Sequence, residues 1–178
     1  MKALIIIDMQ MEMQHRIDSG ADHVNPDAPL RIVALSDAFR QKGWPVVHVR
    51  HRDADPTSPF HQGAPGHAPM PCDDAQKSEP VFLKTTSSGF ASTDLAPYLQ
   101  GKGISDLVVT GAVAGFCVNS TVRAGADLGF NMTVARDAVI GFGLPAAGLS
   151  ARMIFDVTMA HLKADFARVV DAAVLLDE

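Results

Sequence analysis

The sequence predicts an α/β protein built on a parallel sheet of about six strands. Short, continuous runs of apolar and β-branched residues recur along the chain, as is typical of strands buried on both faces. Longer amphipathic stretches lie between several of these runs, as expected of helices that cross over from one parallel strand to the next. With 178 residues, of which 47% are hydrophobic, the chain is expected to form one domain, residues 1–178.

The individual elements follow from these patterns. Six apolar runs are expected to be the strands: Ala3–Ile7, Val46–Val49, Val81–Leu83, Leu107–Thr110, Met132–Ala135 and a short last strand at Val169–Val170. Leu30–Lys42 and Gly115–Leu128 are expected to be helices, because each ends directly before a glycine, a common residue after a helix C-terminus. A further helix should follow Pro145, where apolar residues recur at helical spacing from Met153 to Leu162.

The segment 53–80 departs from this alternation, because it holds six of the eleven prolines of the chain. Long connections without regular structure are commonly functional in compact domains. We expect a defined, substrate-facing loop, which could serve the active site of its own subunit or of a neighbouring one.

Composition narrows the classes of partner. The formal net charge is −5 and no block of lysine or arginine is present, which argues against nucleic acid or an anionic membrane and favours a small molecule. The apolar run at the N-terminus stops at Asp8, too early for a signal peptide, and two cysteines cannot form a disulfide framework. We therefore expect a cytoplasmic protein. No phosphate-binding or dinucleotide motif is found, so no nucleotide cofactor is expected.

Three polar residues stand where predicted strands end. Asp8 and Lys84 follow two of them, and Cys117 opens the helix after the fourth. The carboxyl ends of parallel strands lie at one edge of a sheet, so these side chains should meet there. The start of a helix favours an ionised cysteine, an aspartate can accept the thiol proton, and a lysine stabilises both anions. Together the three residues predict an acyl-transfer site.

The segments that hold these residues resemble the isochorismatase-like cysteine hydrolases. The similarity lies in Ala3–Gln10, in Lys84–Phe90 with Thr93-Asp94-Leu95, and in Gly111–Phe130. It implies a Rossmann-like, three-layer α/β/α sandwich that assembles as a homodimer or higher homo-oligomer. It also implies that Cys117 attacks a carbonyl carbon, that Asp8 carries the proton, and that Lys84 orients and polarises the pair. Water would then hydrolyse the thioester.

The resemblance further implies a cis peptide bond between Ala112 and Val113. Such a bond would direct the amide of Val113, together with that of Cys117, at the oxyanion of the tetrahedral intermediate.

A metal site is not predicted. Nicotinamidase-like members of the family carry an Asp-x-His pair and a further histidine beside the nucleophile, and no such pair follows the second predicted strand. That region holds His48 and His51 among arginines, with His61 and His67 further along. Arginines disfavour a dication. We expect no metal and no other cofactor, and metal binding by these four histidines remains an alternative.

These observations predict a cysteine-dependent hydrolase that cleaves a C–N bond in a small amide, lactam or carbamoyl-type substrate. True isochorismatases hydrolyse a vinyl ether and lack a nucleophilic cysteine. The presence of Cys117 therefore argues against isochorismatase activity for this chain. Two alternatives are a metal-dependent, nicotinamidase-like amidase and a thiol redox or small-molecule sensor on the same fold. Five side chains near the predicted catalytic edge are candidates for substrate binding: Gln10, Phe60, Phe90, Phe116 and Phe142.

Overall fold

Six parallel strands form the centre of the protein. The computed structural model describes all 178 residues. The parallel strands lie in the order β4-β3-β1-β5-β6-β7. A seventh strand of two residues, β2, pairs antiparallel with the far end of β6. The strands are β1 (Lys2–Ile7), β2 (His23–Val24), β3 (Val46–His51), β4 (Val81–Lys84), β5 (Asp106–Ala112), β6 (Asn131–Phe142) and β7 (Ala167–Val170).

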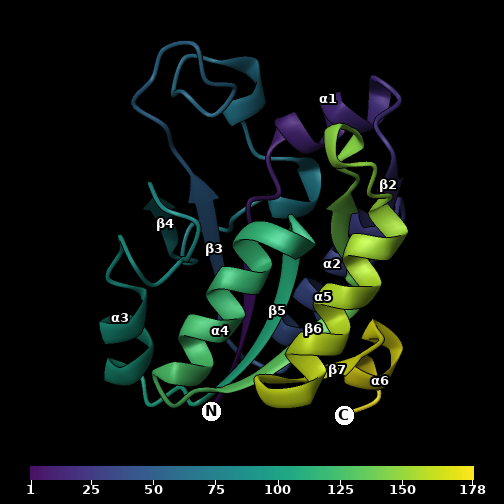
Figure 1. Ribbon diagram of the computed structural model, residues 1–178. Coiled ribbons are helices and arrows are strands. Elements are labelled where there is room, and N and C mark those ends of the chain that lie inside the picture. Colours follow the sequence, from purple (N-terminus) through teal and green to yellow (C-terminus); the bar gives the residue numbers. More distant parts are fainter.

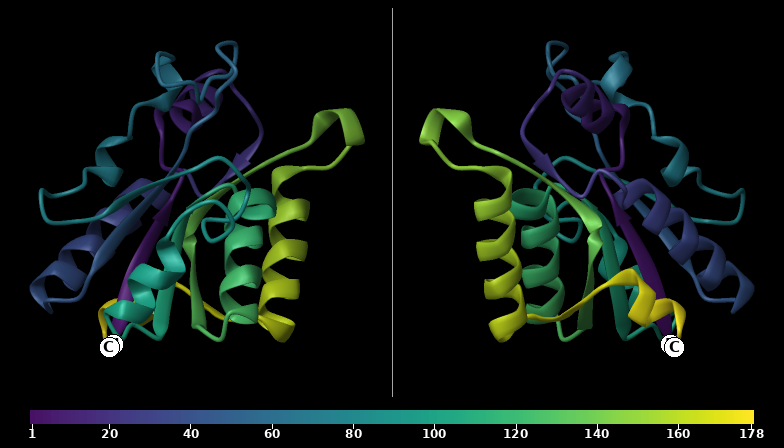
Figure 2. Two further views of the ribbon diagram at one scale, coloured as in Figure 1. Left: turned by 90° about the vertical axis from the view of Figure 1, so that its left-hand side faces the viewer. Right: turned by 90° about the vertical axis from the view of Figure 1, so that its right-hand side faces the viewer.

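Helices cover both faces of the sheet, so the three-layer α/β/α sandwich is confirmed (Figures 1 and 2). One layer contains α3 (Leu95–Gly101), α4 (Asn119–Asp127) and α5 (Ala151–Asp165), and the other contains α2 (Ala28–Gln41) and α6 (Ala172–Leu176). Strand β1 shows why two cores form: Ile5 packs into one of them and Ile6 into the other, because successive side chains point to opposite faces.

The C-terminal ends of the parallel strands are covered by two segments. Helix α1 (Met11–Asp18) follows β1 almost directly, and the loop 53–80 packs against it (Figure 1). The backbone joins them, because the Met11 amide donates to the Ala68 carbonyl at 2.7 Å. The loop contains two short 3₁₀ turns, Pro65–His67 and Pro71–Asp73. This end of the sheet therefore has a roof made of α1 and the proline-rich loop.

Several elements differ from the sequence expectations. Strand β4 is an edge strand, and Val81 and Leu83 are about 40% exposed, so the expectation that this run is buried on both faces was wrong. The helix after Pro145 begins only at Ala151, where the Ser150 hydroxyl accepts from the Met153 amide and caps it. Elements α1, α3, α6 and β2 were not foreseen. No helix in the structure is both long and apolar enough to cross a membrane.

Candidate active site

Asp8, Lys84 and Cys117 meet at the C-terminal edge of the sheet. The ammonium nitrogen of Lys84 lies 2.8 Å from Asp8 Oδ2 and 3.3 Å from Cys117 Sγ. Asp8 directly follows β1, Lys84 ends β4, and Cys117 lies in the turn after β5. Their convergence follows from the parallel sheet, which brings the ends of distant strands to one edge.

Lys84 is completely buried, and its charge is balanced locally. Strand β3 separates β4 from β1, so the side chain passes the end of β3, where His51 Nδ1 lies 3.0 Å from the ammonium. The ammonium also donates to the Thr86 carbonyl at 3.1 Å. With Asp8 and Cys117, these groups offer an acceptor to each of its three N–H donors. Burial of the ammonium is therefore compensated by hydrogen bonds and by one carboxylate.

Asp8 has an unusual backbone conformation and one carboxylate oxygen without a hydrogen-bond partner. Its φ is +50°, a left-handed conformation that aspartate adopts more readily than most residues. Its amide donates to the Val49 carbonyl at 2.8 Å, which ties it to β3. Oδ2 pairs with Lys84, while buried Oδ1 has no hydrogen-bond partner. Burial raises the pKa of Asp8, and Lys84 opposes that rise. The carboxylate is thus a stronger base than an exposed one, with an oxygen available to accept a proton.

Cys117 occupies a π-helical turn, Ala114–Val118, ahead of α4. The turn closes on Val113, whose carbonyl accepts from the amides of Phe116 at 3.0 Å and Val118 at 3.3 Å. The peptide bond between Ala112 and Val113 is cis, as the resemblance implied. Val113 and Cys117 both border the same pocket.

The expectation of a resting thiolate was wrong. Burial, together with the negative charge of Asp8, raises the pKa of Cys117 to about 12, and Lys84 only partly opposes these two effects. The sequence argument counted the helix terminus but not the desolvation of the sulfur. The resting group is a neutral thiol beside a base.

A pocket of about 270 Å³ opens onto Cys117. Nine residues line it: Asp8, Met13, Arg16, His51, Phe60, Ser87, Val113, Phe116 and Cys117. Two of the five proposed substrate-binding residues, Phe60 and Phe116, are among them.

The other three lie elsewhere. Gln10 is fully buried and holds the roof together, donating to the carbonyls of His51 at 3.0 Å and His67 at 2.9 Å. Phe90 stacks on Phe130 at a ring distance of 5.5 Å, and Phe142 is buried beneath Arg16.

Sequence reasoning missed Arg16 and Ser87 as pocket residues. It considered the segment Met9–Met13 as a possible part of the pocket wall, and Met13 does line the pocket. Met13 and Arg16 are three residues apart on α1, so they project from one side of that helix. Only one residue of α1 is buried, so its apolar periodicity is too weak to identify the helix, and with it the position of Arg16.

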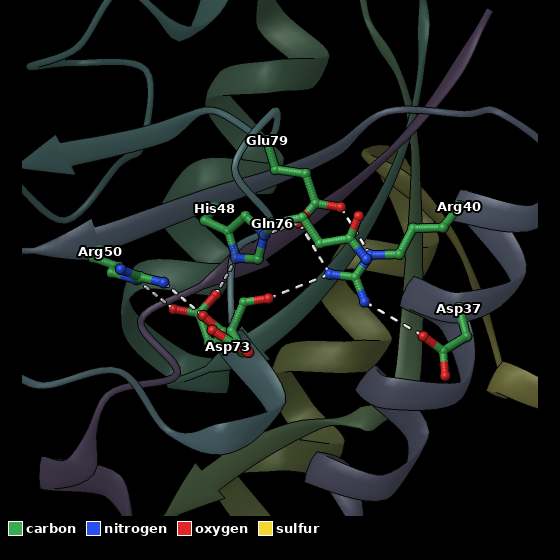
Figure 3. Close-up of polar contacts among 8 residues, drawn as sticks. Asp37, Arg40, His48, Arg50, Asp73, Gln76 and Glu79 are labelled. Carbon is green, nitrogen blue, oxygen red and sulfur yellow. Dashed lines mark hydrogen bonds and ion pairs between the residues drawn. The ribbon is translucent and has the colours of Figure 1, made fainter.

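A buried ionic network fastens the loop 53–80 to the sheet and to α2 (Figure 3). His48 of β3 lies between two carboxylates, with Nδ1 2.5 Å from Asp73 and Nε2 3.1 Å from Glu79. Arg50 pairs with Asp73 at 2.6 Å, and Arg40 of α2 pairs with Glu79 at 2.8 Å. Burial opposes the ionisation of Glu79, but the hydrogen bond from Arg40 holds its pKa at about 2. The loop is therefore anchored at a defined position.

This arrangement leaves no constellation suited to a metal ion. No group of three or more histidine, cysteine or carboxylate side chains is placed to hold one. His48 is engaged by carboxylates, and His51 presents Nδ1 to the ammonium of Lys84. A dication beside that ammonium would be repelled.

The fold and the buried cluster define a class of α/β protein in which a cysteine stands beside an aspartate–lysine pair at the C-terminal edge of a parallel sheet. The family model for the isochorismatase domain matches residues 2–173. The chain belongs to the isochorismatase family, whose members are hydrolases.

Individual relatives agree with this assignment. The isochorismatase family protein YrdC of Bacillus subtilis is 29% identical over 99% of this chain and 95% of its own length. A streptothricin hydrolase of Streptomyces noursei is 31% identical over 82% of this chain and 52% of its own. The crystal structure of an isochorismatase family protein from Chromobacterium violaceum has a TM-score of 0.92 at 31% identity, covering 99% of this chain and 92% of that one.

Proposed function

We propose that this protein is a cysteine hydrolase that cleaves a C–N bond of a small amide, lactam or carbamoyl-type substrate through a thioester. One observation carries the proposal: the buried ammonium of Lys84 lies within hydrogen-bonding distance of both Asp8 and Cys117, beside a pocket. A similarity to streptothricin hydrolase supports an amide-type substrate.

In the first half-reaction, Sγ of Cys117 attacks the carbonyl carbon while its proton passes to Asp8. Because the thiol has a raised pKa, the proton leaves as the C–S bond forms rather than beforehand. The C–N bond then breaks, and Asp8 returns the proton to the departing nitrogen. Ammonia or an amine leaves, and a thioester remains on Cys117.

The intermediate carries a negative charge on the former carbonyl oxygen. The amides of Val113 and Cys117 are the donors proposed to stabilise it, since both residues border the pocket next to the nucleophile. Lys84 stays protonated throughout, which keeps the Asp8 carboxylate and the developing thiolate stable in a buried site.

In the second half-reaction, water attacks the thioester carbon and Asp8 accepts one of its protons. The C–S bond breaks, the thiolate of Cys117 takes the proton back, and a carboxylic or carbamic acid is released. All protons are accounted for without a cofactor.

The thiol-sensor alternative fits this site less well. Sensor cysteines react as thiolates with low pKa values, whereas burial raises the pKa of Cys117 to about 12.

The test is hydrolysis of a panel of primary amides, carbamoyl compounds and lactams, followed by ammonia release or by mass spectrometry of ring opening. Cys117→Ala should abolish turnover. The matched control is Cys72→Ala, because burial raises the pKa of Cys72 to about 12 as well, but Cys72 does not line the pocket. Turnover that survives Cys117→Ala would contradict the proposal, and turnover lost with EDTA would favour a metal-dependent, nicotinamidase-like amidase.

A further inference from the structure

The catalytic pocket contains a cation without an anionic partner. Arg16 lines the pocket together with Asp8 and Cys117 and is half-buried. Its side chain forms no ion pair and no hydrogen bond in the structure: every carboxylate oxygen lies more than 4.0 Å from its nitrogens. Removing a charge from water without a partner is unfavourable, so a half-buried guanidinium without an ion pair is suited to bind an anionic group that enters the pocket.

Packing fixes the guanidinium without using its donors. Its central carbon lies 3.9 Å from the centre of the Phe142 ring. A guanidinium stacked on an aromatic face keeps its N–H groups around its edge, in the fork that matches a carboxylate. Arg16 is therefore held in place while its hydrogen-bond donors stay free.

The other charges of the pocket do not neutralise Arg16. Asp8 and Lys84 form a pair and cancel one another at 2.8 Å. Asp22 lines a second pocket that Arg16 also borders, but its Oδ2 accepts from the Ala151 amide at 2.7 Å and makes no ion pair with the guanidinium. Asp22 does not line the catalytic pocket, so Asp8, Lys84 and Arg16 together leave that pocket with one surplus positive charge.

We propose that Arg16 binds a carboxylate of the substrate, so that the enzyme acts on small amides that carry an anionic group. The volume of about 270 Å³ and the aromatic side chains of Phe60 and Phe116 suit a short carbon chain between the amide and the carboxylate, as in monoamides of dicarboxylic acids. This substrate class rests on the proposed function, whereas the anion-binding role of Arg16 does not.

The anion-binding role is tested with two alkylating agents of similar size, iodoacetate and iodoacetamide. Both form a C–S bond with Cys117 and release iodide, and only iodoacetate carries a carboxylate. Peptide mass spectrometry separates labelling of Cys117 from that of Cys72. The ratio of the two alkylation rates is measured in the native protein and compared with the same ratio for glutathione. It reports whether a cation acts in the pocket that holds Cys117, and it does not require hydrolysis of any substrate.

We expect Arg16→Gln to lower the iodoacetate to iodoacetamide ratio about 10-fold, because a charge-assisted contact is lost. The iodoacetamide rate itself should change less than about 2-fold, and Arg16→Lys should retain part of the preference. The control is Arg31→Gln on α2, because Arg31 pairs with Asp137 outside the pocket. An unchanged ratio in Arg16→Gln, or an equal fall in both rates, would overturn the role of Arg16.

The substrate class is tested with isosteric pairs, malonamate with malonamide, succinamate with succinamide, and glutaramate with glutaramide. At least one carboxylate member should be hydrolysed with a kcat/KM about 10 to 100 times that of its neutral partner, and Arg16→Gln should erase that preference. Equal rates within every pair would refute the substrate class while leaving the hydrolase intact. Absence of turnover on any amide would count against the proposed function, and the alkylation ratio would still decide the role of Arg16.

Discussion

His51 and Lys84 are in direct contact, with His51 Nδ1 3.0 Å from the ammonium nitrogen of Lys84. An ammonium can only donate, so Nδ1 accepts and the hydrogen of the neutral imidazole lies on Nε2. Burial and the charge of Lys84 both lower the pKa of His51. The ring also packs edge-on against Phe60, at 5.2 Å between centroids. His51 thereby positions the lysine and connects it to the loop 53–80.

This contact predicts a pH-dependent loss of stability. Below pH 6.5, the ordinary pKa of histidine, His51 takes up a proton in the unfolded chain before it does so in the folded one. The unfolded state then binds more protons, so stability falls with falling pH. His51→Asn keeps an acceptor near Nδ1 but cannot titrate. Urea unfolding at pH 8 and pH 5 should show wild type losing more stability than the variant, and equal losses would contradict this account.

Asp8→Asn should separate the reactivity of Cys117 from catalysis. The charge of Asp8 raises the pKa of Cys117, so its removal should lower that pKa and speed alkylation by iodoacetamide at pH 8. Hydrolysis should nevertheless fall by about 100-fold or more, because the proton acceptor is gone. Alkylation followed over time by mass spectrometry measures the first effect, and kcat/KM on one amide measures the second. Slower alkylation in the variant would mean that Asp8 does not act on the thiol through its charge.

Gly111→Ala should disrupt the pairing of strand β1 with strand β5. Gly111 has a φ of +116°, and a Cβ atom there would overlap the Ile7 carbonyl. We expect a loss of more than about 3 kcal/mol in urea unfolding. Gly103→Ala is the control, because Gly103 also has a positive φ, +66°, but faces open space. It should cost about 1 kcal/mol, and similar losses at both sites would argue against a steric cause.

Asp73→Asn should loosen the loop 53–80 and raise KM. The Asp73 carboxylate is buried between His48 and Arg50, and breaking such a network typically costs about 3–5 kcal/mol. Because Phe60 of this loop lines the pocket, weaker substrate binding should accompany the lost stability. Urea unfolding and steady-state kinetics measure the two effects.

The control for this loop is Asp156→Asn, which removes an exposed ion pair with Arg152 on α5. Exposed pairs contribute at most about 1 kcal/mol, so neither stability nor KM should change appreciably. A raised KM in this variant too would show that the effect is not specific to the loop.

Much of the framework could be predicted from local pattern. The six apolar runs became the six parallel strands. For the central strands β1 and β5 the reason is that a strand buried on both faces is continuously apolar. The convergence of Asp8, Lys84 and Cys117 followed from the same reasoning, since strand ends in a parallel sheet share an edge. Helix α1 could not be found in this way, because it buries only Met13.

The sequence by itself determined the layered α/β architecture and the meeting of Asp8, Lys84 and Cys117 at the C-terminal edge of the sheet, because both depend on hydrophobic period and on strand direction. Only the tertiary structure decided the protonation of Cys117, since burial and the charge of Asp8, which lies far away in the chain, raise its pKa. The tertiary structure also decided which side chains border the pocket. Arg16, Phe60 and Cys117 come from three separate segments, and no local pattern records how the folded backbone brings them together.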